Sequence, residues 1–384
     1  MPASTPADFF KQKRTTAEIK AEIGIAFFRV WCDLYLAGEE NTAGEETITF
    51  LDLNAGSGLD AAGKALTPVK VLEIISESAA TESDLNKQVK TVFTDSNKGV
   101  LNKLRENIEA LEYYAQLKHS PVILDETSQT RFLSDLSANA APTLMLVDPL
   151  SYKWAQEVFA NTVQQGNSDL LLIFDIAKLQ KAVQPDQING LRDFWGNHWQ
   201  AIQDFYLTIG SPVKREKFIT DQFALALQAN QYHPLAFKIN SPDRKKTSHY
   251  IFFASRSKAA YLKMKELLQL YSDWQMDAVP LFGANLQHEA PAIPGFFKFS
   301  HPFCMENLVE ELSQKKKNYH FQSIRQVYEA HSPGTNYVLP NYLTAFTTLR
   351  DMGHINILNS ANKQVKTVTS AGVIFYKLHS TGAK

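Results

Sequence analysis

The side chains best suited to chemistry stand where apolar runs end. The run FLDLNAGSG places Asp52 at the end of an expected strand, followed by Asn54, Gly56, Ser57 and Gly58. Glycines let a turn pass close to a ligand without a side-chain clash. Beside them, an acid and exposed backbone groups can bind the amine and carboxylate of S-adenosylmethionine (SAM), with Asn54 and Ser57 adding hydrogen bonds. A glycine turn by itself is weak evidence of a cofactor, because many such turns are only bends.

Two later strand ends carry further acids. Asp95 ends VFTDSN and is predicted to accept both ribose hydroxyls of the cofactor, as the acid of a dinucleotide site does. The alternative is that Asp95 or Ser96 caps the helix expected from Lys98. Asp125 ends ILDET and can accept from the adenine amino group. Equally, Asp125 and its neighbour can begin a helix, where negative charge is favourable.

The motif LVDPLSY contains the residue types best suited to catalysis. An acid followed by proline at this strand end is typical of amino-methyltransferases, in which the acid accepts from the target amine and a nearby aromatic ring stacks on the base. Asp148, Pro149 and Tyr152 supply these parts, and are the predicted catalytic residues. The spacing departs from DPPY because the aromatic residue comes one position late. A proline that only stops a strand would look similar.

The elements that must position these residues alternate along the first half of the chain. Short apolar runs predict strands, and the segments between them have helical periodicity. The expected strands are TITFLDLNAG, KTVFTDSN, SPVILDET, TLMLVDPL and SDLLLIFDIA, and the expected helices are residues 67–80, 98–117, 128–138 and 154–165. Continuous apolar strands separated by helices indicate a parallel sheet covered on both faces, in a doubly wound α/β fold.

The rest of the chain completes this prediction. Two strands, HPLAFKIN and SHYIFFASR, follow a mostly helical region and are expected to form a closing antiparallel pair, which gives the seven-strand class I methyltransferase (Rossmann-like) arrangement. Three helical patterns and two strands near the C-terminus suggest a winged-helix-like module. The predicted organisation is an N-terminal helical segment (1–36), a methyltransferase-like domain (37–272), a linker (273–303) and a winged-helix-like domain (304–384).

Composition narrows the classes of function. The formal net charge of −1 neither draws the whole molecule to nucleic acid nor excludes it, so any such contact must be local. Three basic clusters could provide it, or could be ordinary solvated surface: residues 11–14, 244–246 and 315–317. The two cysteines lie in apolar surroundings and are expected to be buried, and the scattered histidines predict no metal site. The apolar runs are too short to span a bilayer, so we expect a cytoplasmic protein without membrane contact.

The order of these motifs resembles the three-Cys-motif partner proteins (TcmP). It shows in FFKQKRTTAEIK entering a helix, then FLDLNAGSG, TPVKVLE, VFTDSN, LVDPLSY and HYIFFASR followed by KMKELL, over most of residues 9–265. The resemblance implies a class I SAM-dependent methyltransferase-like fold and a partner protein with a three-cysteine, radical-SAM-like motif. Asn54 replaces the usual phenylalanine of that family, and Leu150 and Ser151 replace the usual Phe-Gly after DP.

Two hypotheses of different class follow. The first is a SAM-dependent methyltransferase acting on nucleic acid, with the strand-end acids and glycines holding the cofactor. The second is a non-catalytic binding or scaffold protein with a methyltransferase-like sheet, which the altered DPLSY corner favours.

Overall fold

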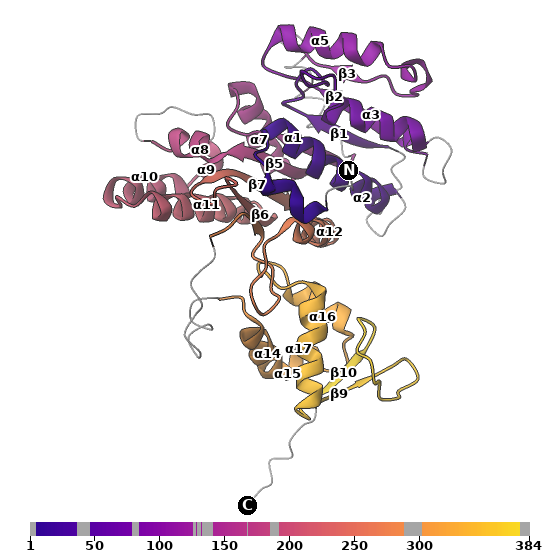
Figure 1. Cartoon of the computed structure of the whole chain (residues 1–384), viewed down its shortest axis with the longest axis vertical. Helices are drawn as coiled ribbons and strands as arrows, with labels where there is room; N and C mark the ends of the chain where they lie inside the picture. Colours follow the sequence, from indigo (N-terminus) through magenta and orange to yellow (C-terminus); the bar gives the residue numbers. More distant parts are fainter. Residues whose placement is uncertain are drawn as a thin grey trace, which may run out of the picture. The chain divides into compact units, whose positions relative to one another are not determined.

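A computed structural model describes residues 5–36, 47–78, 84–125, 128, 132, 141–166, 168–184, 192–287 and 302–376. The chain divides into two compact units, one formed by residues 10–267 and one by residues 1–9 with 268–384. The first unit contains all the predicted cofactor and catalytic residues (Figure 1). The predicted domain boundaries themselves stay predictions.

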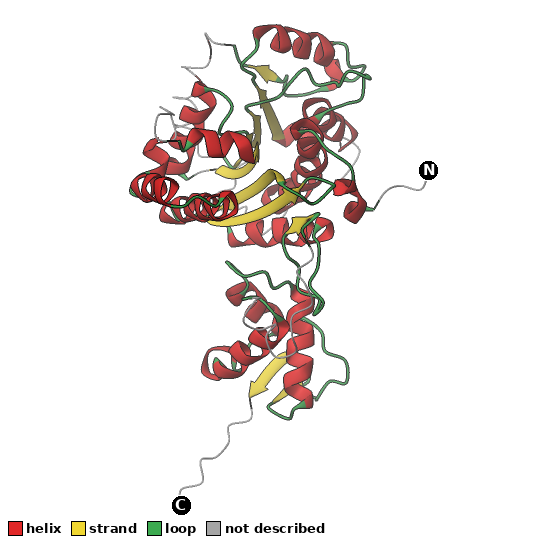
Figure 2. Cartoon of the chain, turned by 60° about the vertical axis from the view of Figure 1, so that its left-hand side comes forward, coloured by secondary structure: helices red, strands yellow, loops and turns green. Residues whose placement is uncertain are grey.

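One twisted sheet forms the frame of the larger unit (Figure 2). Its strands run β3-β2-β1-β4-β5-β7-β6, with β1 to β5 parallel to one another and the β6–β7 pair antiparallel. Their bounds are β1 (Ile48–Asp52), β2 (Val89–Phe93), β3 (Val122–Ile123), β4 (Thr143–Val147), β5 (Ser168–Asp175), β6 (His233–Asn240) and β7 (Thr247–Ser255). The seven predicted strands and the closing antiparallel pair are confirmed. The edge strand β3 is the shortest, with two residues.

Helices follow the strands and fill the longer region between β5 and β6. They are η1 (Pro6–Lys11), α1 (Thr16–Ile19), η2 (Lys20–Gly24), α2 (Ile25–Leu36), α3 (Thr67–Glu77), α4 (Leu85–Gln88), α5 (Lys98–Glu109), η4 (Tyr114–Gln116), α7 (Lys153–Gln165), α8 (Ile176–Ala182), α9 (Arg192–Trp195), α10 (His198–Thr208), α11 (Pro212–Ala229) and α12 (Lys258–Leu268). The helix predicted over residues 128–138 lies almost entirely outside the described residues.

Alternate residues of the central strands pack on opposite faces of the sheet. Phe253 contacts Phe27 of α2 at a ring-centroid distance of 4.7 Å. Its neighbour Phe252 instead contacts Phe223 of α11 at 5.0 Å. Strand side chains point alternately to the two faces, so this division shows that both faces are covered by helices. All five residues of β1 and of β4 are buried, as expected for central parallel strands.

The first helical segment begins as its sequence predicts and then changes its winding. The Thr15 side chain accepts from the backbone N–H of Glu18, and the Glu18 side chain accepts from the backbone N–H of Thr15, which makes a capping box. The helix then passes through a π-helical turn, η2, before α2 resumes the α-helix. π-Helical turns are rare in proteins, and those that occur are often found at functional sites. Lys20 lies at the start of this one.

The second unit contains a small helical core and a pair of antiparallel strands. Its elements are η5 (Gln269–Tyr271), β8 (Gly283–Ala284), α14 (Met305–Gln314), α15 (Lys316–Tyr319), α16 (Ile324–His331), α17 (Leu339–Asp351), β9 (Ile355–Leu358) and β10 (Val373–Tyr376). β9 and β10 pair with each other, and Ser323 bridges to Val373 on the free side of β10. Three main helices followed by two strands is the order of elements that was predicted.

Candidate functional site at the ends of the parallel strands

Asp52 is the buried centre of the site. Its side chain is fully buried, and its Oδ1 accepts from the Nζ of Lys20 at 2.7 Å and from the backbone N–H of Asn54 at 2.9 Å. Lys20 Nζ also donates to the carbonyl oxygen of Asn54 at 2.5 Å. The other oxygen, Asp52 Oδ2, is buried and has no hydrogen-bond partner among the described residues. The π-helical turn of the N-terminal segment therefore delivers an ammonium group to the end of β1.

Burial and charge act against each other on this carboxyl group. Burial raises the pKa of Asp52, whereas the Lys20 ammonium and the hydrogen bond from Asn54 lower it. The carboxylate form thus depends on its cationic neighbour. The sequence did not predict Lys20, because nothing in its local pattern says that a residue 32 positions before Asp52 meets it in space.

The two glycines of the turn after β1 have different surroundings. Gly56 has a φ of +66°, and a Cβ placed on it would have no atom within 4 Å. Gly58 has a φ of +79°, and its Cβ would lie 2.9 Å from Leu104 Cδ1 and 3.1 Å from Val69 Cγ2. Both positions need a left-handed backbone. Gly58 is required by packing, whereas Gly56 borders open space in which a ligand can approach the backbone.

Ser57 between them serves the turn itself. Its hydroxyl donates to the carbonyl oxygen of Leu59 at 2.7 Å, and its own carbonyl accepts from Asn107 at 2.7 Å. The second bond ties the turn to α5.

Asp95, at the end of β2, lies beside the same turn. Its Oδ2 accepts from the backbone N–H of Gly56 at 3.1 Å, and its Oδ1 accepts from the N–H of Asn97 at 3.1 Å. Helix α5 is capped by Asn97, whose side chain accepts from Gly99 and Val100. The alternative that Asp95 or Ser96 caps this helix is therefore wrong, and Asp95 instead connects two strand ends.

Asp125, after the short β3, is exposed and holds a local turn. Its Oδ1 accepts from the backbone N–H and the hydroxyl of Ser128, at 3.0 and 2.8 Å. These contacts join Asp125 to Ser128, and the alternative that Asp125 begins a helix stays a prediction, because most of residues 126–140 lie outside the described part of the chain. The role of Asp125 toward adenine stays a prediction.

The DPLSY corner at the end of β4 is joined to the turn after β1. Asn54 Oδ1 accepts from the backbone N–H of Asp148 at 2.7 Å, and Asn54 Nδ2 donates to Ser151 Oγ at 2.9 Å. The Tyr152 hydroxyl donates to the carbonyl of Leu53 at 2.9 Å. The structure thus brings two sequence motifs together through Asn54, one of the positions that departs from the TcmP pattern. Pro149 lies within the same corner.

The ring of Tyr152 is held by packing against neighbouring side chains. Tyr152 packs against the buried cluster under α7, and its ring stacks with Trp154 at a centroid distance of 6.4 Å. Burial raises the pKa of its hydroxyl well above the ordinary value. Base stacking by Tyr152 stays a prediction.

Asp148 has a cationic partner that the sequence did not reveal. The Nζ of Lys178, on α8, lies 2.6 Å from Asp148 Oδ2, and Asp148 Oδ1 accepts from the backbone N–H of Leu150 at 2.9 Å. The lysine side chain is 50 % exposed and that of Asp148 only 6 %. The DPLSY corner therefore contains an ion pair that is open to solvent on its lysine side.

His249 is a second residue that the sequence did not predict. It pairs with Asp175 across β7 and β5, and its Nε2 lies 3.1 Å from the Thr16 hydroxyl. Burial lowers the pKa of its imidazole; the carboxylates of Asp175 and Asp148 oppose this effect, and Lys178 adds to it.

This environment predicts a pH-dependent stability. Because the folded state holds His249 with a lowered pKa, the unfolded state binds the proton more readily, and the free energy of unfolding must fall as pH decreases from about 7 toward 5. In urea titrations at several pH values, His249→Gln should lose less stability over this range than the wild-type protein. The exposed His354→Gln is the control. Parallel pH profiles for wild type and His249→Gln would contradict the assignment.

The order of the strands and the groups at their ends identify the fold. β1, β2 and β4 bring an acid, a glycine turn and a proline corner to one edge of a 3-2-1-4-5-7-6 sheet, where a doubly wound fold binds its ligand. The chain has the class I methyltransferase fold. No protein-family model and no curated protein matches the sequence.

Several solved structures resemble the chain over part of its length. Protein LPL1258 from Legionella pneumophila, of the family DUF519, is 10 % identical, covering 67 % of this chain and 92 % of its own, with a TM-score of 0.34. The methyltransferase domain of bacterial CtHen1-C is 8 % identical, with coverages of 62 % and 97 % and a TM-score of 0.30. The plantazolicin methyltransferase BamL, in complex with a triazolic desmethylPZN analog and SAH, is 10 % identical, with coverages of 65 % and 90 % and a TM-score of 0.31.

The described part of the chain lacks two other kinds of feature. No three histidine, cysteine or acidic side chains there converge as metal ligands. None of the described helices is both long and apolar enough to cross a bilayer. Both cysteines are buried and unpaired to each other, as expected.

Proposed function

We propose that this protein is a SAM-dependent methyltransferase that acts on nucleic acid. The observation that carries the cofactor assignment is the edge of the sheet at which Asp52, Gly56 and Asp95 meet. At this edge Gly56 borders open space, and the buried carboxylate of Asp52 lies below the same turn. The open space suits a ligand that approaches the backbone closely, and the nearby carboxylates favour a ligand that has a cationic group.

In this proposal each strand end has a separate part. Asp52 and the turn from Asn54 to Gly58 face the amino-acid moiety of the cofactor, Asp95 accepts the ribose hydroxyls, and Asp125 accepts from adenine. When bound, SAM supplies an activated methyl group. Holding the two reactants in line is the principal task left to the protein.

The corner at β4 orients the methyl acceptor. Asp148 is held by Leu150 and Lys178, but a carboxylate has about four lone-pair sites, so it can still accept from an amine. The half-exposed Lys178 places a positive charge beside the same position, which favours an acceptor that carries negative charge nearby. A nucleobase in a phosphodiester chain has both an amine and this charge.

The second unit offers a surface of matching chemistry. Lys315, Lys316 and Lys317 make no ion pair with any described residue, and Phe321, shortly after them, is 63 % exposed. Lysines beside an exposed aromatic ring are typical of surfaces that bind single-stranded nucleic acid. We propose that this unit is a winged-helix-like nucleic-acid-binding domain.

The resemblance to the TcmP family also suggests a protein partner. In that family the expected partner carries a three-cysteine, radical-SAM-like motif, and we propose such a protein as a candidate partner.

Calorimetric titration tests the cofactor assignment. Wild-type protein should bind SAM and S-adenosylhomocysteine, and Asp95→Asn should weaken both by about tenfold, because an amide cannot accept from two hydroxyls as a carboxylate does. Asp60→Asn is the matched control, since Asp60 holds only the exposed loop after the glycine turn. Absence of binding by the wild type, or equal weakening by both variants, would remove the assignment.

The second candidate function is a non-catalytic scaffold. The observation that favours it is that lysines of this chain already pair with both acids, Lys20 with Asp52 and Lys178 with Asp148. Cofactor binding without methyl transfer to any RNA or DNA pool would support this alternative.

A further inference from the structure

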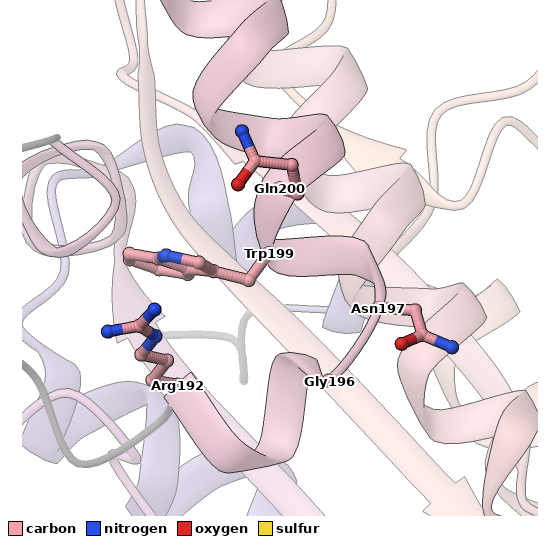
Figure 3. Close-up of a pocket in the computed structure, with 5 residues that line it drawn as sticks. All are labelled: Arg192, Gly196, Asn197, Trp199 and Gln200. Atoms are coloured by element: carbon pink, nitrogen blue, oxygen red, sulfur yellow. The ribbon is translucent and has the colours of Figure 1, made fainter.

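A pocket of about 470 Å³ lies on the helical region between β5 and β6 (Figure 3). Its lining residues are Arg192, Gly196, Asn197, Trp199 and Gln200. The pocket is open to solvent, and its volume falls within the range of small-molecule sites. None of its lining residues belongs to the cofactor or catalytic set described above.

We propose that this pocket is a nucleotide subsite, which holds a base and phosphate of the nucleic-acid substrate outside the nucleotide being methylated. The inference rests on the proposed function. The lining residues bind the substrate away from the reacting centre.

The side chains present the chemistry that a nucleotide needs. In Figure 3 the guanidinium of Arg192 and the indole ring of Trp199 lie on one side of the pocket. Arg192 is exposed, and its guanidinium has no partner among the described residues. A guanidinium fork binds phosphate oxygens in a bidentate manner, and an indole face stacks on any base.

The ring and the amide are held in place by contacts outside the pocket. Trp199 packs against the buried cluster of the larger unit, so its indole is half-buried and positioned. Gln200 donates from Nε2 to Asp204 at 2.9 Å, which leaves its Oε1 to accept from an exocyclic base amine. The nearby Asp204 also disfavours a second phosphate, so the site is suited to one phosphate and one base.

The pocket is connected to the acceptor corner by secondary structure. Helix α8 carries Lys178, which binds Asp148, and ends at Ala182. The next residue, Val183, accepts through its carbonyl oxygen from Gln203 of α10 at 2.7 Å. One side of the pocket is thus fixed to the helix that contacts the predicted catalytic acid.

The inference is tested by titrating full-length protein with a short single-stranded oligonucleotide at several salt concentrations. Arg192→Gln should weaken binding about tenfold and reduce the slope of log K against log[salt] by about 0.7, because one phosphate contact is lost. Lys214→Gln is the matched control: it removes the same charge from the exposed surface of the adjacent α11 and should change neither value as much.

The stacking contact is tested separately. Trp199→Leu keeps an apolar side chain against the core but removes the stacking face, so affinity should fall about tenfold with an unchanged salt slope. Gln200→Ala should also weaken oligonucleotide binding, because it removes the acceptor Oε1. Gln200 is exposed, so this variant tests the same pocket without the risk of misfolding. Trp274→Leu, an exposed tryptophan of the other unit, is the control.

The outcomes separate this inference from the proposed function, because SAM binding is measured on every variant. Equal effects of the pocket and control variants, or equally tight binding of an acidic peptide, would overturn the subsite. Oligonucleotide binding through the pocket by a protein that does not bind SAM would overturn the methyltransferase assignment and leave the subsite in place.

Discussion

Lys20→Met is expected to lower the free energy of unfolding by about 3–5 kcal/mol, the usual cost of leaving one member of a buried ion pair without its partner. The side chains of Lys20 and Asp52 are 5 % and 0 % exposed, so water cannot replace the lost ammonium. The variant also removes the donor to the Asn54 carbonyl oxygen. Urea denaturation at neutral pH measures the effect.

Lys217→Met provides the matched control. Lys217 lies 2.6 Å from Asp221, a separation similar to that of the buried pair, but these side chains are 76 % and 52 % exposed. Exposed pairs contribute about 0–1 kcal/mol, so this variant should be nearly neutral. Equal destabilisation by the two variants would show that burial of the Lys20–Asp52 pair does not decide its contribution.

A double variant separates charge from packing. Lys20→Met with Asp52→Leu removes both charges and should recover much of the stability lost by Lys20→Met. In Lys20→Met alone the pKa of Asp52 rises further, because burial is no longer opposed by the ammonium. Its folded state then binds a proton more readily than its unfolded state, so that variant should become more stable as pH falls toward the raised pKa.

Gly56→Ala is expected to weaken SAM binding by at least about tenfold, which is the largest effect on the proposed activity. The added Cβ meets no protein atom within 4 Å, so it would extend into the space assigned to the cofactor. Its φ of +66° is also unfavourable for alanine, at a cost in stability of about 1 kcal/mol.

Gly63→Ala is a close control for that variant. Gly63 also has a positive φ, +78°, and a Cβ added to it would meet no atom within 4 Å, but it is in the exposed loop after the turn. Both variants should lose a similar amount of stability, and only Gly56→Ala should lose SAM affinity. Loss of affinity in both, or in neither, would place the cofactor elsewhere.

The sequence by itself determined the strands of the sheet and the helices that cover it. Buried strands need continuous apolar runs and covering helices need a 3.6-residue period, and both are local patterns. They were sufficient for the parallel sheet and the closing antiparallel pair. Because parallel strands end at a common edge, the pattern also indicated that Asp52, Asp95 and Asp148 would gather there.

Only the tertiary structure decided which groups these acids meet. Lys20 reaches Asp52 through a π-helical turn, Lys178 reaches Asp148 from α8, and Asn54 joins two loops that are 94 residues apart. The pocket at Arg192 and Trp199 likewise depends on how α9 and α10 meet. Contacts of this kind are set by packing between distant elements, which leaves no periodic signal in the chain.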